Sequence, residues 1–444
     1  MPVTESEAYL ESLARKSFLS MWSHSNLFFG DASAGKGGKE LCDLLVLFRN
    51  NVLLFSDKSC QYPGGPDHDV NWKRWHKRSV RKSVDQLIGA RRTLIQGAFG
   101  LYTDAQLHDP FPLRFPTVDQ ARFFLITVSH GTESECLREH GRSTIKVDSR
   151  LNGSEERLAV GVRFNGHFVH VLDDSTLDIM LTKLDTIADF VAYLEAKEEA
   201  LSQGDIVIDG EENLLAAYLK TYDHDGRHCI PAAGTPDEAS PIRIASGAWE
   251  EYTTSESFHR SVKENRISYN IDLLIEHFTE SIHNGCMITG QDEPLTYHED
   301  GLRLLAAESR LGRRAISASF VSILREEDTT TFWASTVPSC EQAGVRYVFL
   351  TYPEMPAGET LEACEQFLDS HLAEHILVAR HQFRDSNVIV GIAVPNSDCS
   401  MKSHFIRVFN GSDWTSEDHQ HAAALQKRTG LFLNMEEERY IHIE

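Results

Sequence analysis

The sequence of 444 residues lacks any run of 18 or more apolar residues, so we expect no membrane-spanning helix and no membrane partner. Its first residues lack the basic start and apolar core of a secretory signal. None of the eight cysteines forms a Cys-x-x-Cys pair, which disfavours a zinc ribbon or a disulfide scaffold and fits reduced thiols. We therefore expect a cytoplasmic protein.

Several common catalytic signatures are also missing. The 21 histidines include no His-Glu-x-x-His pair, which disfavours a zinc peptidase. No Gly-x-Ser-x-Gly turn is present, which disfavours a serine hydrolase of the α/β type. No internal repeat or low-complexity tract is present. The chemistry must therefore come from a less conspicuous set of residues.

Positive charge is scarce, because 43 lysines and arginines face 66 acids and the net charge is −23. Such a balance disfavours a nucleic-acid partner. The segment from Asn71 to Arg92 is the exception, with only the acid Asp85. Its basic residues are Lys73, Arg74, Lys77, Arg78, Arg81, Lys82, Arg91 and Arg92. We expect the first six of these to contact a polyanion, although they could instead pair with the acidic second half of the chain and occlude the site.

Periodicity and turn residues predict a mixed α/β protein with a central sheet. The expected elements of the first part are a helix over 5–21, two strands within 39–60, a long helix over 70–98, strands over 122–128, 158–164 and 168–172, and one or two helices over 177–201. A polar stretch near Gly204 suggests domains 1–204 and 205–444. The second is expected to be an α/β domain with a regulatory or targeting role, with helices over 211–219, 254–264, 271–283 and 359–375 and strands over 346–350, 387–394 and 405–409.

The stretch from Lys39 to Cys60 reads as a β-hairpin. Two apolar runs, Leu45–Phe48 and Val52–Phe55, flank the turn residues Arg49-Asn50-Asn51. A hairpin brings its ends together, so Asp43 should meet the segment Ser56-Asp57-Lys58. Acids beside a lysine at a strand end suit a hard divalent ion and an anionic substrate.

The order of elements in the first part of the chain resembles the restriction-endonuclease-like PD-(D/E)XK nuclease superfamily. In that family, a helix carries a glutamate, the next strand carries an aspartate, and a hairpin leads to a second strand that ends in an acid-x-Lys motif. The Mrr, NERD and Holliday-junction-resolvase branches are the most similar in style. The resemblance implies an α-β-β-α-β core with a mixed sheet in the first 130 to 200 residues. It assigns the metal-binding aspartate to Asp43, the lysine to Lys58, and the first-helix glutamate to Glu7 or else Glu11. Gln86, on the following helix, matches a glutamine common in several branches.

One position departs from this pattern, because Ser56 stands where the second acid is expected. A hydroxyl is a poorer ligand for Mg²⁺ than a carboxylate. Asp57 could turn inward through a bulge and supply the oxygen, or Glu40 could supply it from the neighbouring strand. Otherwise the site is degenerate and binds without cutting.

The resemblance implies metal-dependent hydrolysis of phosphodiester bonds, with Mg²⁺ or Mn²⁺ as cofactor and nucleic acid, DNA rather than RNA, as substrate. The catalytic candidates are Asp43, Lys58, Asp57, Ser56 and Glu40, and the candidate metal ligands are Asp43, Asp57, Glu7 and Glu11. The six cations and Gln86 are the expected nucleic-acid contacts, with Trp72 and Trp75 stacking or packing nearby.

Bacterial proteins with such a domain often act against phage or foreign DNA, which the resemblance extends to this chain. Two other classes stay open. One is a non-catalytic module of the same fold that binds nucleic acid or a partner protein. The other is a sensor or scaffold in which the acidic second region carries the function. A partner protein and a homo-oligomer also stay open as partners of the chain.

Overall fold

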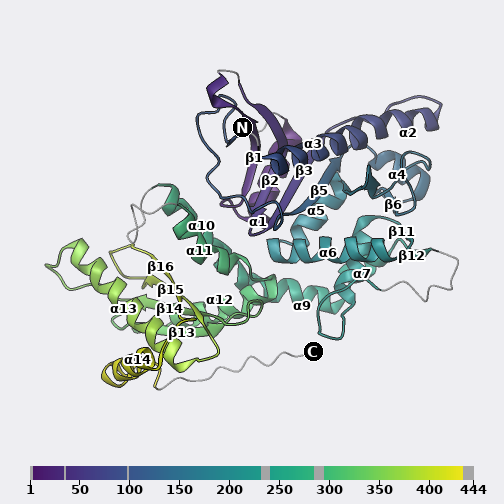
Figure 1. The fold of residues 1–444 in the computed structure, drawn as a ribbon. Helices are drawn as coiled ribbons and strands as arrows, with labels where there is room; N and C mark the ends of the chain where they lie inside the picture. The colour runs from purple at the N-terminus through teal and green to yellow at the C-terminus, as the bar shows by residue number, and fades with distance from the viewer. Residues whose placement is uncertain (1–3, 35–36, 98–99, 232–240, 285–294, 434–444) are drawn as a thin grey trace. The chain divides into compact units, whose positions relative to one another are not determined.

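The computed structural model describes residues 4–34, 37–97, 100–231, 241–284 and 295–433. The chain forms two compact units, Met1–Arg260 and Ser261–Glu444 (Figure 1). The predicted mixed α/β class is confirmed. The boundary suggested near Gly204 lies inside the first unit, directly after a helix that ends at Gln203.

The first unit is built on a six-stranded mixed sheet with the order β10-β5-β3-β2-β1-β4. Its strands are β1 (Ser23–Gly30), β2 (Lys39–Phe48), β3 (Asn51–Lys58), β4 (Gly100–Tyr102), β5 (Arg122–Ser129) and β10 (His170–Asp173). Strands β3, β5 and β10 run parallel, whereas the remaining neighbours are antiparallel. Parallel strands end at one edge of a sheet, so the last residues of β3 and β5 lie side by side.

The predicted hairpin is confirmed as β2 and β3, which pair from Leu44↔Phe55 to Phe48↔Asn51. Its turn is the pair Arg49-Asn50, and Arg49 adopts a positive φ of 53°. The preceding strand β1 was not predicted. Its sequence SHSNLFFG begins with turn-forming residues, and the strand is held by pairing with β2 and β4 rather than by local preference.

Helices cover both faces of this sheet. Helix α1 (Glu5–Phe18) begins with a capping box between Thr4 and Glu7. Phe18 of α1 packs on Phe55 of β3 together with Phe190 of α6 (Ile187–Gln203). The long helix after β3 contacts β2, β3 and β5 through its second half, and since side chains alternate along a strand, it lies on the face opposite Phe55.

The predicted long helix is interrupted. It consists of α2 (His68–His76), a π-helical turn (Lys77–Arg81) and α3 (Lys82–Gln96). The predicted segment 177–201 forms two helices, α5 (Asp174–Lys183) and α6.

A smaller sheet with the order β12-β11-β6-β7 completes the first unit. The elements around it are α4 (Glu133–His140), β6 (Lys146–Asp148), β7 (Ala159–Val160), β8 (Arg163–Phe164), β9 (His167–Phe168), β11 (Ile206–Ile208), α7 (Glu211–Lys220), β12 (Ile242–Ile244) and α8 (Ala248–Thr253). Helix α9 (Glu256–Asn265) crosses the division between the units. The strands predicted over 158–164 and 168–172 are thus divided into shorter pieces, and Asn165-Gly166 is the turn between β8 and β9.

The second unit has a four-stranded sheet with the order β13-β14-β15-β16. Its strands are β13 (Trp333–Pro338), β14 (Val345–Tyr352), β15 (Val388–Pro395) and β16 (Phe405–Asn410), and its helices are α10 (Tyr269–His283), α11 (Leu295–Ala306), α12 (Arg310–Leu324), α13 (Leu361–Gln382) and α14 (Ser416–Thr429). Strands β14 and β15 are parallel and are joined through α13, whose apolar side chains pack in the core of the unit. The three strands predicted here are confirmed, whereas β13 was not predicted.

Among the helices described, none is long and apolar enough to cross a membrane. The described cysteines are free thiols.

Candidate functional site

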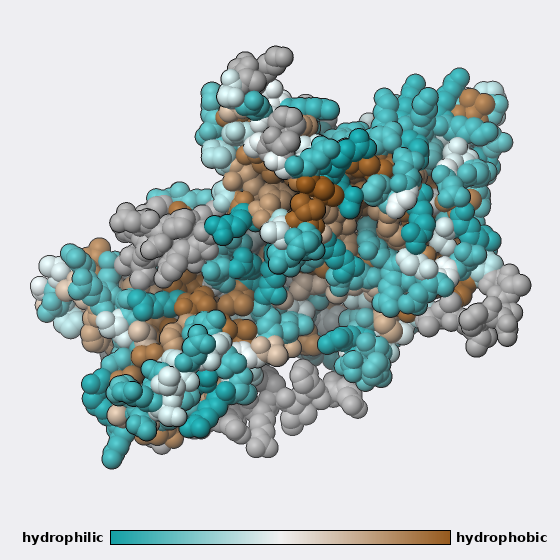
Figure 2. Space-filling model, viewed as in Figure 1, coloured by the Kyte–Doolittle hydropathy of each residue, from teal (hydrophilic) through white to brown (hydrophobic). Residues whose placement is uncertain are grey.

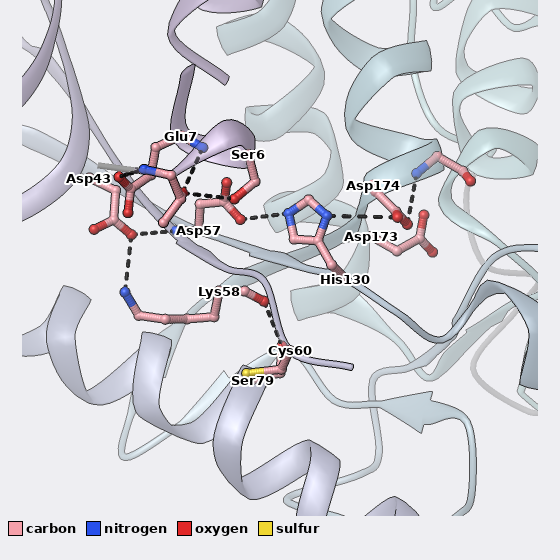
Figure 3. Close-up of polar contacts among 12 residues, drawn as sticks. Ser6, Glu7, Asp43, Asp57, Lys58, Cys60, Ser79, His130, Asp173 and Asp174 are labelled. Atoms are coloured by element: carbon pink, nitrogen blue, oxygen red, sulfur yellow. Dashed lines mark hydrogen bonds and ion pairs between the residues drawn. The ribbon is translucent and has the colours of Figure 1, made fainter. Parts of the chain in front are cut away.

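The candidate site forms where the ladder between β2 and β3 stops. Beyond Leu44↔Phe55, the Asp43 carboxylate takes the place of a backbone partner. Its Oδ2 accepts a hydrogen bond from the backbone N–H of Asp57 at 2.5 Å and lies 3.3 Å from the Lys58 ammonium (Figure 3). The Asp43 side chain is 2% exposed and that of Lys58 is 30% exposed. The sequence-predicted meeting of Asp43 and Lys58 therefore occurs, with the lysine reaching solvent.

Gln86 of α3 joins the same group. Its Nε2 donates to Asp43 Oδ1 at 3.4 Å, and its Oε1 accepts from the Ser56 hydroxyl at 3.0 Å. Gln86, assigned to the nucleic-acid contacts in the sequence, thus orients the Asp43 carboxylate. Ser56 acts as a hydrogen-bond donor and brings no negative charge to the site.

Glu40 approaches Asp43, and the charge of Glu7 acts on Glu40. The pKa of Glu40 is raised by burial, then by the charge of Asp43 and a hydrogen bond with it, and also by the charge of Glu7, while Lys58 lowers it. Figure 3 draws Glu7 of α1, whose carboxylate accepts a hydrogen bond from the Thr4 backbone N–H at 3.1 Å. Glu11, the alternative first-helix glutamate, instead forms an ion pair with Arg15 at 2.9 Å.

Asp57 points to the other face of the sheet. Strand β3 stays in register with β5 through Asp57↔Val128 and Lys58↔Ser129, so the side chains keep alternating and no bulge turns Asp57 toward Asp43. The Asp57 Oδ1 instead lies 2.6 Å from His130 Nε2, and its buried Oδ2 has no hydrogen-bond partner among the described residues. Of the two acids proposed to replace the missing one, Glu40 is the one beside Asp43.

His130 was not predicted as a functional residue. It follows β5 directly and bridges two acids, because its Nδ1 lies 3.7 Å from Asp174. Burial lowers the pKa of His130, but hydrogen bonds and charge from Asp174 and Asp57 outweigh burial and raise it to about 9. The available signal was its position after a strand parallel to β3, since such strands end at a common edge.

The basic segment lies on the solvent side of α2, the π turn and α3. Lys73, Arg74, Lys77, Arg78 and Lys82 are exposed, whereas Arg81 is half-buried over the Phe164 ring. In the described ranges, none of these six cations forms an ion pair with an acid. In Figure 2, hydrophilic side chains predominate around α2, and apolar patches are also visible in the region of α3.

The two tryptophans of this helix are core residues. Trp72 is 1% exposed and Trp75 is fully buried, with their rings stacked on each other at 5.2 Å. The Trp75 indole N–H donates to the His130 carbonyl at 2.9 Å. Both tryptophans therefore pack in the core and are not placed to stack on bases.

No three His, Cys, Asp or Glu side chains in the part of the chain that the structure describes are grouped to hold a metal ion. A Mg²⁺ ion needs fewer protein ligands than three, because one or two carboxylates commonly hold it together with water and substrate phosphate. Asp43 and Glu40 supply two carboxylates. Burial raises the pKa of Glu40 most, and the negative charge of Asp43 raises it further, and a cation would relieve that second contribution. These residues therefore fit one divalent ion, without a contribution from Asp57 or Glu11.

No family model matches this chain, and no curated protein or solved structure is significantly similar to it. The resemblance to the nuclease superfamily rests on the residues and element order of this chain alone.

Proposed function

We propose that the first unit is a metal-dependent nuclease with a restriction-endonuclease-like core, acting on nucleic acid and on DNA in preference to RNA. The contact of 3.3 Å between Asp43 and Lys58 carries this proposal, because it places a carboxylate and a solvent-reaching ammonium together at the end of β3. The long helix that supplies Gln86 to this pair also carries the six cations, which have no acidic partner among the described residues.

Each residue of the site would have its own role in phosphodiester hydrolysis. Asp43 and Glu40 would hold the ion, which when bound supplies a water of lowered pKa and neutralises charge on the phosphate. Lys58 orients a phosphate oxygen or the attacking water through its exposed ammonium. Gln86 fixes the second oxygen of Asp43 and thereby its orientation.

Nicking of supercoiled plasmid in Mg²⁺, Mn²⁺ or EDTA tests the proposal. We expect nicking with either metal and none with EDTA. D43N and K58M should each lower the nicking rate by about 10²-fold or more, because each removes a charged group at the reacting phosphate. E11Q is the matched control, since Glu11 pairs with Arg15 instead. Nicking that persists in D43N and K58M would show that the assigned site is wrong.

A second candidate function is a binding module without catalysis. The observation favouring it is Ser56, which contributes a neutral donor to Gln86 where the nuclease pattern has an acid. This candidate predicts DNA binding that weakens with salt and is unchanged by D43N, with no nicking in either metal.

A further inference from the structure

Burial along the basic helix repeats every four residues. The buried positions come in pairs, which are Asn71 with Trp72, Trp75 with His76, Ser79 with Val80, and Ser83 with Val84. The six cations occupy the positions between them, as Lys73 with Arg74, Lys77 with Arg78, and Arg81 with Lys82. We call these three pairs the cation ladder.

A straight α-helix cannot keep such a pattern on one face. With 3.6 residues per turn, positions four apart advance by about 40°, so three repeats would wind the pattern by about 120° around the helix. The π turn at Lys77–Arg81 lies in the middle of the pattern. Its i→i+5 hydrogen bonds put more residues into a turn and so wind the pattern back. The buried pairs thus stay on the protein and the cation ladder stays in line on the solvent side.

The ladder leads to the candidate site. Ser79, within the π turn, is fully buried, and its hydroxyl donates to the Lys58 carbonyl at 3.5 Å. The next repeat after Arg81 and Lys82 is Asp85 with Gln86, and Gln86 contacts Asp43. From Lys73 to Arg81 the helix rises about 12 Å, at about 1.5 Å per residue. One nucleic-acid strand rises by that distance over three to four nucleotides, at about 3.4 Å each.

Several arginines elsewhere in the first unit have an acidic partner, whereas the six cations of the ladder have none among the described residues. Arg15, Arg150 and Arg122 each have an acidic partner, at 2.9 Å from Glu11, 2.7 Å from Asp148 and 3.5 Å from Glu198, respectively. The chain has 66 acids and 43 bases, yet no described acid forms an ion pair with a cation of the ladder. A polyanion from outside is the partner that this arrangement fits.

We propose that the π turn aligns the cation ladder so that it follows consecutive phosphates of one nucleic-acid strand and leads that strand to Gln86 and Lys58. This proposal rests on the proposed nucleic-acid substrate and names how the strand is held. It does not require cleavage, so its failure can be distinguished from failure of the nuclease proposal.

The test is the salt dependence of binding by the full chain, measured in EDTA with fluorescent single-stranded and duplex DNA. Each phosphate contact contributes about 0.7 to the slope of log K against log salt for a single strand and about 0.9 for a duplex. K77A/R78A should lower the slope by about 1 to 2. The control K16A/R114A removes the same charge from exposed positions of the first unit and should leave the slope unchanged.

A gain of binding tests the alignment itself. D85K turns the fourth repeat into a cation and should raise the slope by about 1. D119K makes the same charge change at an exposed position that is not part of the helix and should not raise the slope. Equal slopes for D85K and D119K, or for K77A/R78A and its control, would overturn the proposal. So would tighter binding to phosphatidylserine vesicles than to DNA. Ladder-dependent binding without any nicking would instead sink the nuclease proposal alone.

Discussion

Replacing His130 with alanine removes the cation that faces the buried Asp57 carboxylate. Asp57 is 3% exposed, and its only described side-chain partner is His130 at 2.6 Å. A rise in the pKa of His130 from 6.5 to about 9 corresponds to about 3 kcal/mol, at about 1.4 kcal/mol per pKa unit. Removing one member of a buried ion pair typically costs about 3–5 kcal/mol of stability, which agrees with the value obtained from the pKa of His130.

The sign of the pH dependence follows from the direction of this shift. The pKa of His130 is higher in the folded state than in the unfolded state, so the folded state binds the proton more tightly. Its contribution to stability is fully present below about pH 6.5 and is lost as the pH rises through about 9. H130A should therefore lower the free energy of unfolding by about 3 kcal/mol at pH 6 and by much less at pH 10.

Urea unfolding followed by tryptophan fluorescence at pH 6 and pH 10 measures this difference. The first unit contains the buried Trp22, Trp72 and Trp75, which report on it directly. D57N/H130A is the matched control, because it removes the buried charge together with its partner and should be more stable than H130A alone. Equal losses for H130A at both pH values would refute the reasoning. A double variant no more stable than H130A would refute it as well.

Two further predictions concern buried carboxylates. S56D adds an acid beside Gln86 and Asp43, so it should lower the melting temperature without metal and be stabilised by Mg²⁺ more than the natural chain is. At 100 times its own dissociation constant for Mg²⁺, S56D should be stabilised by about 2.7 kcal/mol relative to S56D without metal. An equal Mg²⁺ effect on the two proteins in thermal unfolding would contradict this prediction. Burial raises the pKa of Glu212 to about 7, so the contribution of Glu212 to stability should fall as the pH rises from about 4.5 through 7. E212Q should flatten this dependence and gain about 1–3 kcal/mol at pH 8, measured by thermal unfolding at pH 5 and 8, and a loss of stability at pH 8 would contradict it.

The parts of the site that were predictable are those joined by a short stretch of chain. Asp43 and Lys58 meet because a two-residue turn connects their strands, and the apolar runs on either side specify that pairing. The alternation of side chains along β3 also follows from the sequence, but which face carries the site does not. The long helix was predicted with ordinary α-helical periodicity, although its buried pairs repeat every four residues. In the sequence, the cation pairs 73/74, 77/78 and 81/82 repeat with the same spacing, and that repeat was the available signal for the π turn.

The parts that were missed depend on contacts between distant segments. Strands β1 and β13 have sequences with many small or polar residues, and each is held by a neighbouring strand rather than by its own propensity. His130 comes 73 residues after Asp57 and reaches it only because β5 lies beside β3. The burial of both tryptophans was likewise decided by what packs against the helix.

By itself, the amino-acid sequence determined the β2–β3 hairpin, the approach of Asp43 to Lys58 and the concentration of cations on one helix, because each depends on residues close together in the chain. Only the tertiary structure decided that Asp57 faces His130, that Gln86 holds Asp43 and that the cations form one line beside the site. Those arrangements arise from the order of strands in the sheet and from the π turn, which local preferences do not specify.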